Sequence, residues 1–429
     1  MTSSIASHLA SILPADTKVI PWEQVGESDR ENIENAITGN PPDCLVFPDN
    51  SETLAEIVRI ANENRWPLLI RGAGSKLDWG NPVNSPRIVV CTGQLNRAIE
   101  HAVGDLVITV EAGMTLADLQ AFLAPSRQFL PVDPSYLDRT TIGGLVATAD
   151  AGGWRQRYGG VRDLILGFSF VRHDGAIAKA GGRVVKNVAG YDMMKLFTGS
   201  FGTLGIISEV TLRLFPMISD SETLLITGSG ESIAKLSYII RQSALTPTIA
   251  EILTEKMVKA LTSIEKIGLL LRFESIPESI AEQGKQIAAL AGQLDCSIDY
   301  YRDGEERDLW QRYRNTMDHP GDKDANFCKI GILPSAFGAI VPGIDGIGSI
   351  NIGSGVGKLI LPAGADIARI RGMTGENQGY LSLLSAPKSV KESIEPWGYT
   401  GNSIDLMKTL KNKFDPNRIF NPERFINKI

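Results

Sequence analysis

The chain has 429 residues, which is too long for a single core and predicts two domains. Its hydrophobic content of 43% and charged content of 21% are ordinary for a globular protein, and they fit neither a disordered chain nor a membrane-embedded one. The net charge of −6 argues against nucleic acid as the main partner, because phosphate contacts require a basic surface.

The chain also lacks the sequence signals of export and membrane insertion. No apolar stretch approaches the roughly 20 residues that span a bilayer, so we expect no transmembrane segment. The first thirty residues contain no basic segment followed by an apolar core, and they predict no signal peptide. We therefore expect a cytoplasmic protein, and composition leaves open whether partners bring it to the inner membrane.

The cysteines are widely spaced and form no C-x-x-C pair. That spacing excludes a cysteine-ligated iron–sulfur cluster or a zinc knuckle within this chain. We expect reduced, buried thiols instead. The four positions are Cys44, Cys91, Cys296 and Cys328.

In chain order, residues 1–40 are polar and are expected to cover a surface. A β-α-β unit follows, with a strand at 44–48, a helix capped by Ser51 and a strand at 68–70. The second strand leads into residues 71–75, which read Arg-Gly-Ala-Gly-Ser. Glycine lets backbone N–H groups approach a ligand closely, so this loop is a candidate phosphate-binding loop.

Further elements continue the same domain. Strands are predicted at 87–91 and 106–111, and a helix is predicted to begin at Thr115. Residues 141–144 place two glycines at the start of a helix of small residues. Asp-Gly within residues 173–175, flanked by apolar runs, predicts a hairpin.

The run from 181 to 216 reads as a polar loop, a short helix, a glycine-rich turn at 199–205 and an apolar strand at 206–214. Successive inward-pointing N–H groups in such a turn form a concavity suited to a diphosphate. Together with residues 71–75, this turn predicts a split cradle for a large phosphate-containing cofactor. A dinucleotide fingerprint is disfavoured because Leu77 stands where the third glycine belongs, and no Gly-Lys-Ser/Thr of a Walker A loop is present.

From about residue 219, strand-like and helix-like segments alternate and predict a second α+β domain, with short strands and turns over 331–364. The segment 414–424 contains two prolines and cannot be a regular helix. We therefore predict an α+β chain in four parts. They are an extension at 1–40, a cofactor domain at 41–217, a cap or substrate domain at 218–405 and a tail at 406–429 that packs back near the cofactor.

These motifs resemble the flavoprotein family typified by vanillyl-alcohol oxidase and p-cresol methylhydroxylase, whose PCMH-type FAD-binding domain has two α+β lobes. The resemblance covers residues 42–216 and 414–424. Residues 186–192 and 199–205 are similar to the FAD subunits of bacterial glycolate oxidase, above all the smaller, E-type subunit. That resemblance implies two partners, a larger D-type FAD subunit and an iron–sulfur subunit.

The resemblance also implies which residues contact FAD. Residues 74–77 contain no histidine or cysteine, unlike relatives that tether the flavin through the first loop, so FAD is expected to be noncovalent. The implied FAD-contacting residues are Arg71, Gly72, Ala73, Gly74, Ser75, Thr141, Ile142, Gly143, Gly144, Gly202, Gly205 and Ile206.

The catalytic residues are harder to assign. The 2-hydroxy-acid dehydrogenases of this family carry a histidine-rich metal motif in the second domain, whereas His319 is the only histidine after Pro216. We therefore expect no metal site. Tyr191 is a weak candidate near the flavin, and Arg314 is a candidate clamp for a carboxylate. The simpler interpretations are a packing tyrosine and an arginine in water, and for Asp192 a helix cap.

The expected function is that of an FAD-binding subunit of a glycolate oxidase or dehydrogenase, in which glycolate is oxidised to glyoxylate and the flavin passes electrons onward. Because the family histidines are missing, we expect the isolated chain to lack glycolate turnover. Two alternatives stay open. One is a stand-alone FAD-dependent dehydrogenase of another 2-hydroxy acid or alcohol, with Tyr191 or His319 as base, and the other is an assembly subunit with a degenerate flavin site.

Overall fold

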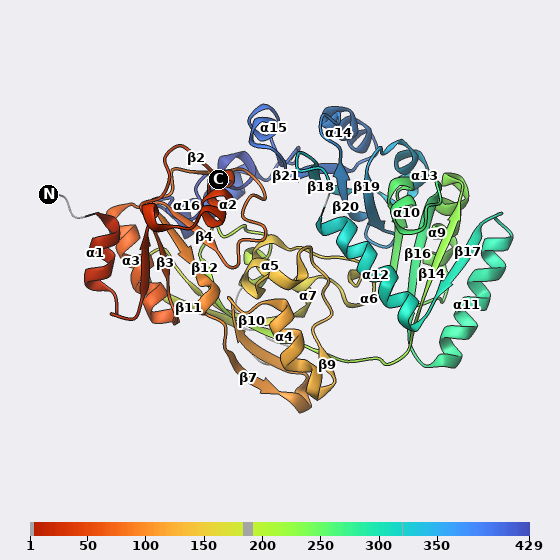
Figure 1. The fold of residues 1–429 in the computed structure, drawn as a ribbon, viewed down its shortest axis with the longest axis horizontal. Coiled ribbons are helices and arrows are strands. Elements are labelled where there is room, and N and C mark those ends of the chain that lie inside the picture. The colour runs from red at the N-terminus through yellow and green to blue at the C-terminus, as the bar shows by residue number, and fades with distance from the viewer. Residues whose placement is uncertain (1–3, 183–191, 320) are drawn as a thin grey trace. The chain divides into compact units, whose positions relative to one another are not determined.

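The computed structural model describes residues 4–182, 192–319 and 321–429. The chain forms two compact units (Figure 1). The first unit combines Met1–Asp150, Gly160–Pro216 and Thr400–Ile429, so it takes both ends of the chain. The second unit combines Ala151–Gly159 with Met217–Tyr399.

The first lobe of the first unit is built on a four-stranded sheet with the order β1-β3-β6-β4. Strands β3, β6 and β4 are parallel, and β1 pairs antiparallel with β3. Parallel strands of one sheet need a crossover connection, which the helix α3 (Ser51–Asn64) provides between β3 and β4 on either side of β6. The strands are β1 (Lys18–Pro21), β3 (Cys44–Phe47), β4 (Leu68–Arg71) and β6 (Ile88–Cys91).

Two details of this lobe differ from the sequence-based expectation. The cap of α3 is Asn50, whose Oδ1 accepts a hydrogen bond from the N–H of Thr53 at 2.7 Å, and Ser51 is the first helical residue. Residues 1–40 do not merely cover a surface. The helix α1 (Ile5–Ile12) buries Ile5, Ala6 and Leu9, and a second helix, α2 (Glu27–Asn35), buries Ile33. Several apolar residues of this segment are therefore part of the core, whereas Ile12 at the end of α1 is 45% exposed.

The second lobe carries a five-stranded antiparallel sheet with the order β11-β10-β12-β8-β7. The predicted hairpin is present between β10 and β11, which pair antiparallel. The strands are β7 (Ala98–Ala102), β8 (Val107–Glu111), β10 (Ile165–Val171), β11 (Ile177–Gly181) and β12 (Ile206–Arg213). The helices are α4 (Leu116–Leu123), α5 (Ile142–Thr148), α7 (Val161–Leu164) and α8 (Met193–Phe197).

Short pairings complete the first unit. They join β2 (Ile37–Thr38) to β5 (Val83–Asn84) and β9 (Gln128–Phe129) to β13 (Phe215–Pro216).

The second unit is an eight-stranded antiparallel sheet with the order β17-β14-β16-β15-β19-β20-β18-β21. Alternation of helices and strands matches the predicted α+β texture. The strands are β14 (Ser221–Gly228), β15 (Ile249–Leu253), β16 (Ile267–Glu274), β17 (Ser297–Tyr301), β18 (Asn326–Gly331), β19 (Ile347–Asn351), β20 (Val356–Leu361) and β21 (Tyr380–Ser385). The helices are α6 (Arg155–Tyr158), α9 (Gly230–Gln242), α10 (Glu255–Thr262), α11 (Pro277–Gly292), α12 (Asp303–Asp318), α13 (Phe337–Ile340), α14 (Ile367–Glu376) and α15 (Lys388–Ser393).

The tail returns to the first unit. It forms α16 (Ile404–Phe414) and then continues without a regular helix through the two prolines, as predicted. The backbone then runs beside β4, where the N–H of Leu68 donates to the carbonyl of Ile419 and the N–H of Asn421 donates to the carbonyl of Leu68. The tail is therefore an additional edge of the first lobe.

Candidate cofactor site

One cavity of the first unit is bounded by glycine-containing loops from both lobes and by the tail. The space between its walls is about 800 Å³, a figure that includes solvent at its open side. Its lining comes from the loop after β4 (residues 70–77), Thr92, the start and body of α5 (140–148), the turn at 200–207 and the tail residues Asn421 and Arg424.

The structure brings together nearly all of the residues implied as FAD contacts. The exception is Ile142, which is fully buried in the core of the second lobe and does not line the cavity. Its neighbours line the cavity because successive helical residues face different directions. The implied residues that line the cavity are Arg71, Gly72, Ala73, Gly74, Ser75, Thr141, Gly143, Gly144, Gly202, Gly205 and Ile206.

Two of the glycines are required by close approach and backbone conformation. A Cβ on Gly72 would lie 2.2 Å from Oγ1 of Thr141, far inside van der Waals contact. Gly202 has φ of +68°, and a Cβ there would lie 2.7 Å from Nδ2 of Asn421. At both positions a side chain would push one wall of the cavity against another.

The charges of the cavity lining suit an anionic ligand. Three cationic side chains (Arg71, Lys76 and Arg424) line it, and the described lining residues include no carboxylate. Arg424 is buried and donates from Nη1 to the carbonyls of Leu77 and Trp79. Burial lowers the pKa of Arg424 to about 10, so its guanidinium stays charged at neutral pH. A diphosphate therefore meets fixed positive charge as well as backbone N–H groups.

A buried hydroxyl in the lining has no protein partner among the described residues. Ser200 is only 5% exposed, and its Oγ is excluded from solvent. This hydroxyl makes no hydrogen bond to the described residues. Buried hydroxyl groups in folded proteins nearly always have a partner, so an orphan in a cavity wall indicates a ligand. The glycine cradle, the cations and this hydroxyl together fit FAD.

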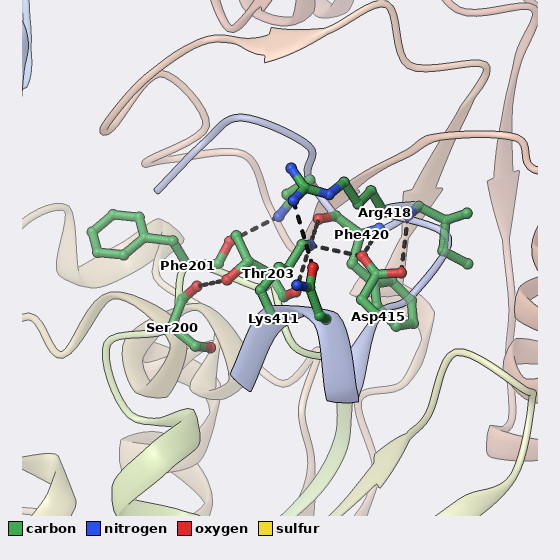
Figure 2. A network of polar contacts seen from close by, with 10 residues as sticks. Ser200, Phe201, Thr203, Lys411, Asp415, Arg418 and Phe420 are labelled. Carbon is green, nitrogen blue, oxygen red and sulfur yellow. Dashed lines mark hydrogen bonds and ion pairs between the residues drawn. The ribbon is translucent and has the colours of Figure 1, made fainter. Parts of the chain in front are cut away.

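A buried ion pair holds the tail against the glycine turn (Figure 2). Nζ of Lys411 lies 2.7 Å from Oδ2 of Asp415 and also donates to the carbonyls of Thr203 and Phe420 at 2.8 and 3.0 Å. Asp415 in turn accepts hydrogen bonds from the N–H groups of Ile419 and Phe420. We call the pair Lys411–Asp415 the tail latch. It fixes the backbone immediately before the two tail residues of the cavity.

Asn421 then joins the two glycine loops directly. Its Oδ1 accepts from the N–H of Ile70 at 2.9 Å, next to the first loop, and its Nδ2 donates to the carbonyl of Phe201 at 2.8 Å, in the second. Its backbone has φ of +39°, a region that asparagine tolerates better than most residues. One side chain thus sets the spacing of the cradle.

The sequence predicted that the tail lies near the cofactor, but it did not predict which tail side chains line the cavity. Ser200 and Phe201 fall inside the glycine-rich turn, so the motif already contained them. Lys76 directly follows the first loop, and its charge was the available signal. The lining residues not predicted are Ile70, Lys76, Leu77, Thr92, Thr140, Ala147, Thr148, Ser200, Phe201, Ile207, Asn421 and Arg424.

The catalytic candidates are not brought into this cavity by the described structure. Tyr191, together with residues 183–190, lies outside the described residues. Arg314 is an exposed residue of α12, and His319 is exposed at the end of the same helix. Asp192 caps α8, accepting from the N–H of Lys195 at 3.2 Å, as the simpler interpretation predicted.

The second unit contains a buried acid–hydroxyl cluster of its own. Tyr313 donates to Oε2 of Glu251 at 2.6 Å, and its hydroxyl also lies 2.6 Å from Oγ of Ser349. Burial raises the pKa of Glu251, partly opposed by these hydrogen bonds. Asn351 ends β19 and accepts from the N–H groups of Gly353 and Ser354, so residues 351–355 form a tight turn before β20.

Two features are absent from the described part of the chain. No cluster of three or more histidine, cysteine, aspartate or glutamate side chains is arranged to hold a metal ion there. No described helix is both long and apolar enough to cross a membrane.

Part of the first unit matches a known protein family. Residues 42–181 match the family described as an FAD binding domain, and these residues contain the first loop and the start of α5. The chain therefore carries a PCMH-type FAD-binding domain. Its cofactor is FAD, and its chemistry is that of an FAD-dependent oxidoreductase. The sequence-based predictions of family, cofactor and α+β fold are confirmed.

The relatives of this flavoprotein include subunits of glycolate oxidase. The chain is 27% identical over 459 residues to glycolate oxidase subunit GlcD of Bacillus subtilis, covering 96% of the chain and 97% of the relative. It is 38% identical over 170 residues to subunit GlcE of Escherichia coli, covering 39% of the chain and 48% of the relative. A D-lactate dehydrogenase of Archaeoglobus fulgidus is 31% identical over 261 residues, 58% of each chain. The chain thus spans only about half the length of the last two.

Solved structures share the fold of the flavoprotein. It superposes on 4-ethylphenol oxidase from Gulosibacter chungangensis with a TM-score of 0.75 at 16% identity, covering 98% and 96% of the two chains. p-Cresol methylhydroxylase with bound substrate gives a TM-score of 0.75 at 14% identity, covering 97% and 95%. At these identities the likeness establishes the fold alone.

Proposed function

We propose that this flavoprotein oxidises the CH–OH group of a small 2-hydroxy acid, glycolate, as an FAD subunit of a multisubunit glycolate oxidase. The observation that carries the proposal is the cation-lined, glycine-walled cavity, which fits FAD. The names of the relatives from B. subtilis and E. coli support the substrate and the complex. Residues 218–405 would then form the cap or substrate domain.

When bound, FAD accepts the two electrons released as glycolate becomes glyoxylate. The chain's own contribution is to bind and orient the cofactor. Backbone N–H groups of residues 72–75 and of Gly202 would hold the diphosphate, and the hydroxyl of Ser200 would donate to the cofactor. The tail latch keeps Asn421 and Arg424 in the wall, so the cavity stays closed on the tail side.

The cofactor would be held without a covalent bond. The described lining residues include neither histidine nor cysteine. Cys91 is the last residue of β6 and pairs with Arg71 at the start of the first loop, but burial raises its pKa to about 11, so it is a thiol rather than a nucleophilic thiolate at neutral pH. Acid precipitation of the protein should therefore release all of its yellow colour into the supernatant.

Dependence on partners is part of the same proposal. The second unit contains a single histidine, His319, on an exposed helix end, and the proton acceptor for a hydroxy acid would come from elsewhere in the complex. The partners would be a D-type FAD subunit and an iron–sulfur subunit, which would also determine any contact with the inner membrane. Electrons would pass through the FAD of this chain.

The decisive experiment is anaerobic reduction of the purified, FAD-loaded chain by glycolate, alone and after addition of the two partner subunits. We expect the flavin absorbance to persist with the chain alone and to bleach only in the complex. The control is dithionite, which must reduce both samples. Absence of bleaching in the complex would contradict the proposed function.

A second candidate is a self-sufficient dehydrogenase of another 2-hydroxy acid. The match to a D-lactate dehydrogenase favours it, as does the buried acid–hydroxyl pair Glu251–Tyr313. Rapid bleaching of the isolated chain by D-lactate would establish this candidate. A chain that purifies colourless and takes up no FAD would leave an assembly subunit with a degenerate flavin site.

A further inference from the structure

A buried ion pair joins the cavity wall to the interior of the first unit. Nζ of Lys76 lies 2.9 Å from Oδ2 of Asp150, and the two side chains are 5% and 2% exposed. Lys76 lines the cavity, whereas Asp150 is not among the lining residues. The pair is therefore a buried dipole whose lysine, rather than its aspartate, belongs to the wall of the cofactor site.

This dipole is held rigidly. Oδ2 of Asp150 also accepts from the N–H of Ser135 at 2.8 Å, and the carbonyl of Ser135 accepts from Oγ1 of Thr140 at 2.8 Å. The ammonium of Lys76 lies 5.3 Å from the ring centre of Trp79, which is 2% exposed. A charge fixed in this way acts without reorganisation, which is the condition for strong electrostatic stabilisation in a site shielded from water.

The diphosphate is an unsuitable target for this pair. It is a permanent dianion, and the glycine loops and Arg424 already supply donors and positive charge for it. A neutral ion pair adds little net charge. Its dipole matters most for a group whose charge changes during turnover, and the flavin ring is such a group. Uptake of two electrons and one proton converts the neutral oxidised ring into a reduced ring with one negative charge.

We propose that Lys76, held by Asp150, stabilises the reduced form of the bound flavin and so raises its reduction potential. Charge beside the flavin ring is one of the means by which proteins tune flavin chemistry. The proposal rests on FAD binding and is independent of the substrate. It assigns Lys76 an electrostatic function and Asp150 a positioning function.

The test is the midpoint potential of bound FAD, measured by slow anaerobic reduction against a reference dye. Lys76→Met keeps the length of the side chain and removes its charge. We expect the preference of the protein for reduced over oxidised FAD to fall about tenfold, which is about 30 mV to lower potential for a two-electron couple. Asp150→Asn removes the opposing charge and should shift the potential in the opposite direction.

Two further variants keep the result interpretable. Lys179→Met removes an exposed lysine of the same unit, 75% exposed, and should leave the potential unchanged. Lys76→Met leaves Asp150 buried without its partner and is expected to fold less well. The double variant Lys76→Met/Asp150→Asn avoids that penalty, and its potential should lie below that of Asp150→Asn alone.

An unchanged potential in Lys76→Met and in the double variant, with FAD still bound, would overturn the proposal. So would a weaker FAD affinity without a change in potential, since that result would place the ammonium at the phosphates. Because the electrons come from a chemical reductant, these outcomes do not depend on whether glycolate is the substrate.

Discussion

The two units use their buried polar groups in opposite ways. In the first unit, Ser200, Lys76 and Arg424 border a shared cavity. In the second, the carboxylate of Glu306 is satisfied within the unit, because it accepts hydrogen bonds from Ser221, Thr223 and Arg272. That network attaches α12 to β14 and β16. Polar groups directed at a cavity indicate a ligand, whereas polar groups that satisfy one another stabilise a fold.

The variant with the largest expected effect, Lys411→Met, tests whether the tail is part of the cofactor unit. Lys411→Met leaves Asp415 buried without its cation, and we expect a loss of about 3–5 kcal/mol in the free energy of unfolding. FAD content should fall with it, because Asn421 loses its support. Denaturant unfolding and the flavin absorbance ratio measure the two effects. Lys408→Met, an exposed lysine of the same helix, is the control, and equal behaviour of the two variants would contradict the latch.

Asn421→Ala tests the bridge between the glycine loops. The substitution leaves the N–H of Ile70 and the carbonyl of Phe201 without their hydrogen-bond partner. Each unsatisfied buried group costs about 1–3 kcal/mol of folding free energy. We expect FAD to dissociate at least tenfold more readily, measured by fluorescence titration of the apoprotein. Asn417→Ala removes an exposed tail asparagine that contacts Asn62 and should change neither quantity. Unaltered affinity in Asn421→Ala would show that the loops keep their spacing without the bridge.

Gly72→Ala tests the close approach within the cradle. The new methyl group would meet the side chain of Thr141 at 2.2 Å, and overpacking of this kind costs about 1–3 kcal/mol. We expect weaker FAD binding together with a lower melting temperature. Gly93→Ala adds the same methyl group where no atom lies within 4 Å, so it should bind FAD normally. Normal binding by both variants would count against the cradle at Gly72.

The smallest effect concerns the second unit and depends on pH. Burial raises the pKa of Glu251 above its ordinary value of 4.5 in the folded state. The unfolded chain therefore loses this proton first as the pH rises, and stability falls from about pH 4.5 upward until the folded carboxyl also ionises. Glu251→Gln removes this dependence. The melting temperature of Glu251→Gln should rise relative to that of the original chain as the pH increases above about 4.5, whereas that of Glu282→Gln, at an exposed position, should not. Parallel curves for all three proteins would be inconsistent with a raised pKa of the buried carboxyl.

Local patterns predicted much of the first unit. The strand before residues 71–75, the hairpin at 173–175 and the cap of α8 follow from turn chemistry and periodicity over a few residues. The bridge made by Asn421 joins residues that are 351 positions apart, and no local pattern encodes such a pair. The pairing of Lys76 with Asp150 was missed for the same reason. The N-terminal helix was missed because Ile5, Ala6 and Leu9 are too few to dominate a polar segment.

The cavity wall is formed by segments that are synthesised at widely separated times. Domains fold in the order in which they emerge, but Lys411, Asn421 and Arg424 are synthesised only after all of the second unit. The glycine loops therefore lack the tail side of the cavity wall while residues 217–399 are made. We therefore expect FAD to be captured late in biogenesis, after residues 217–399 have been made, and to be held less well by a nascent chain that stalls within the second unit.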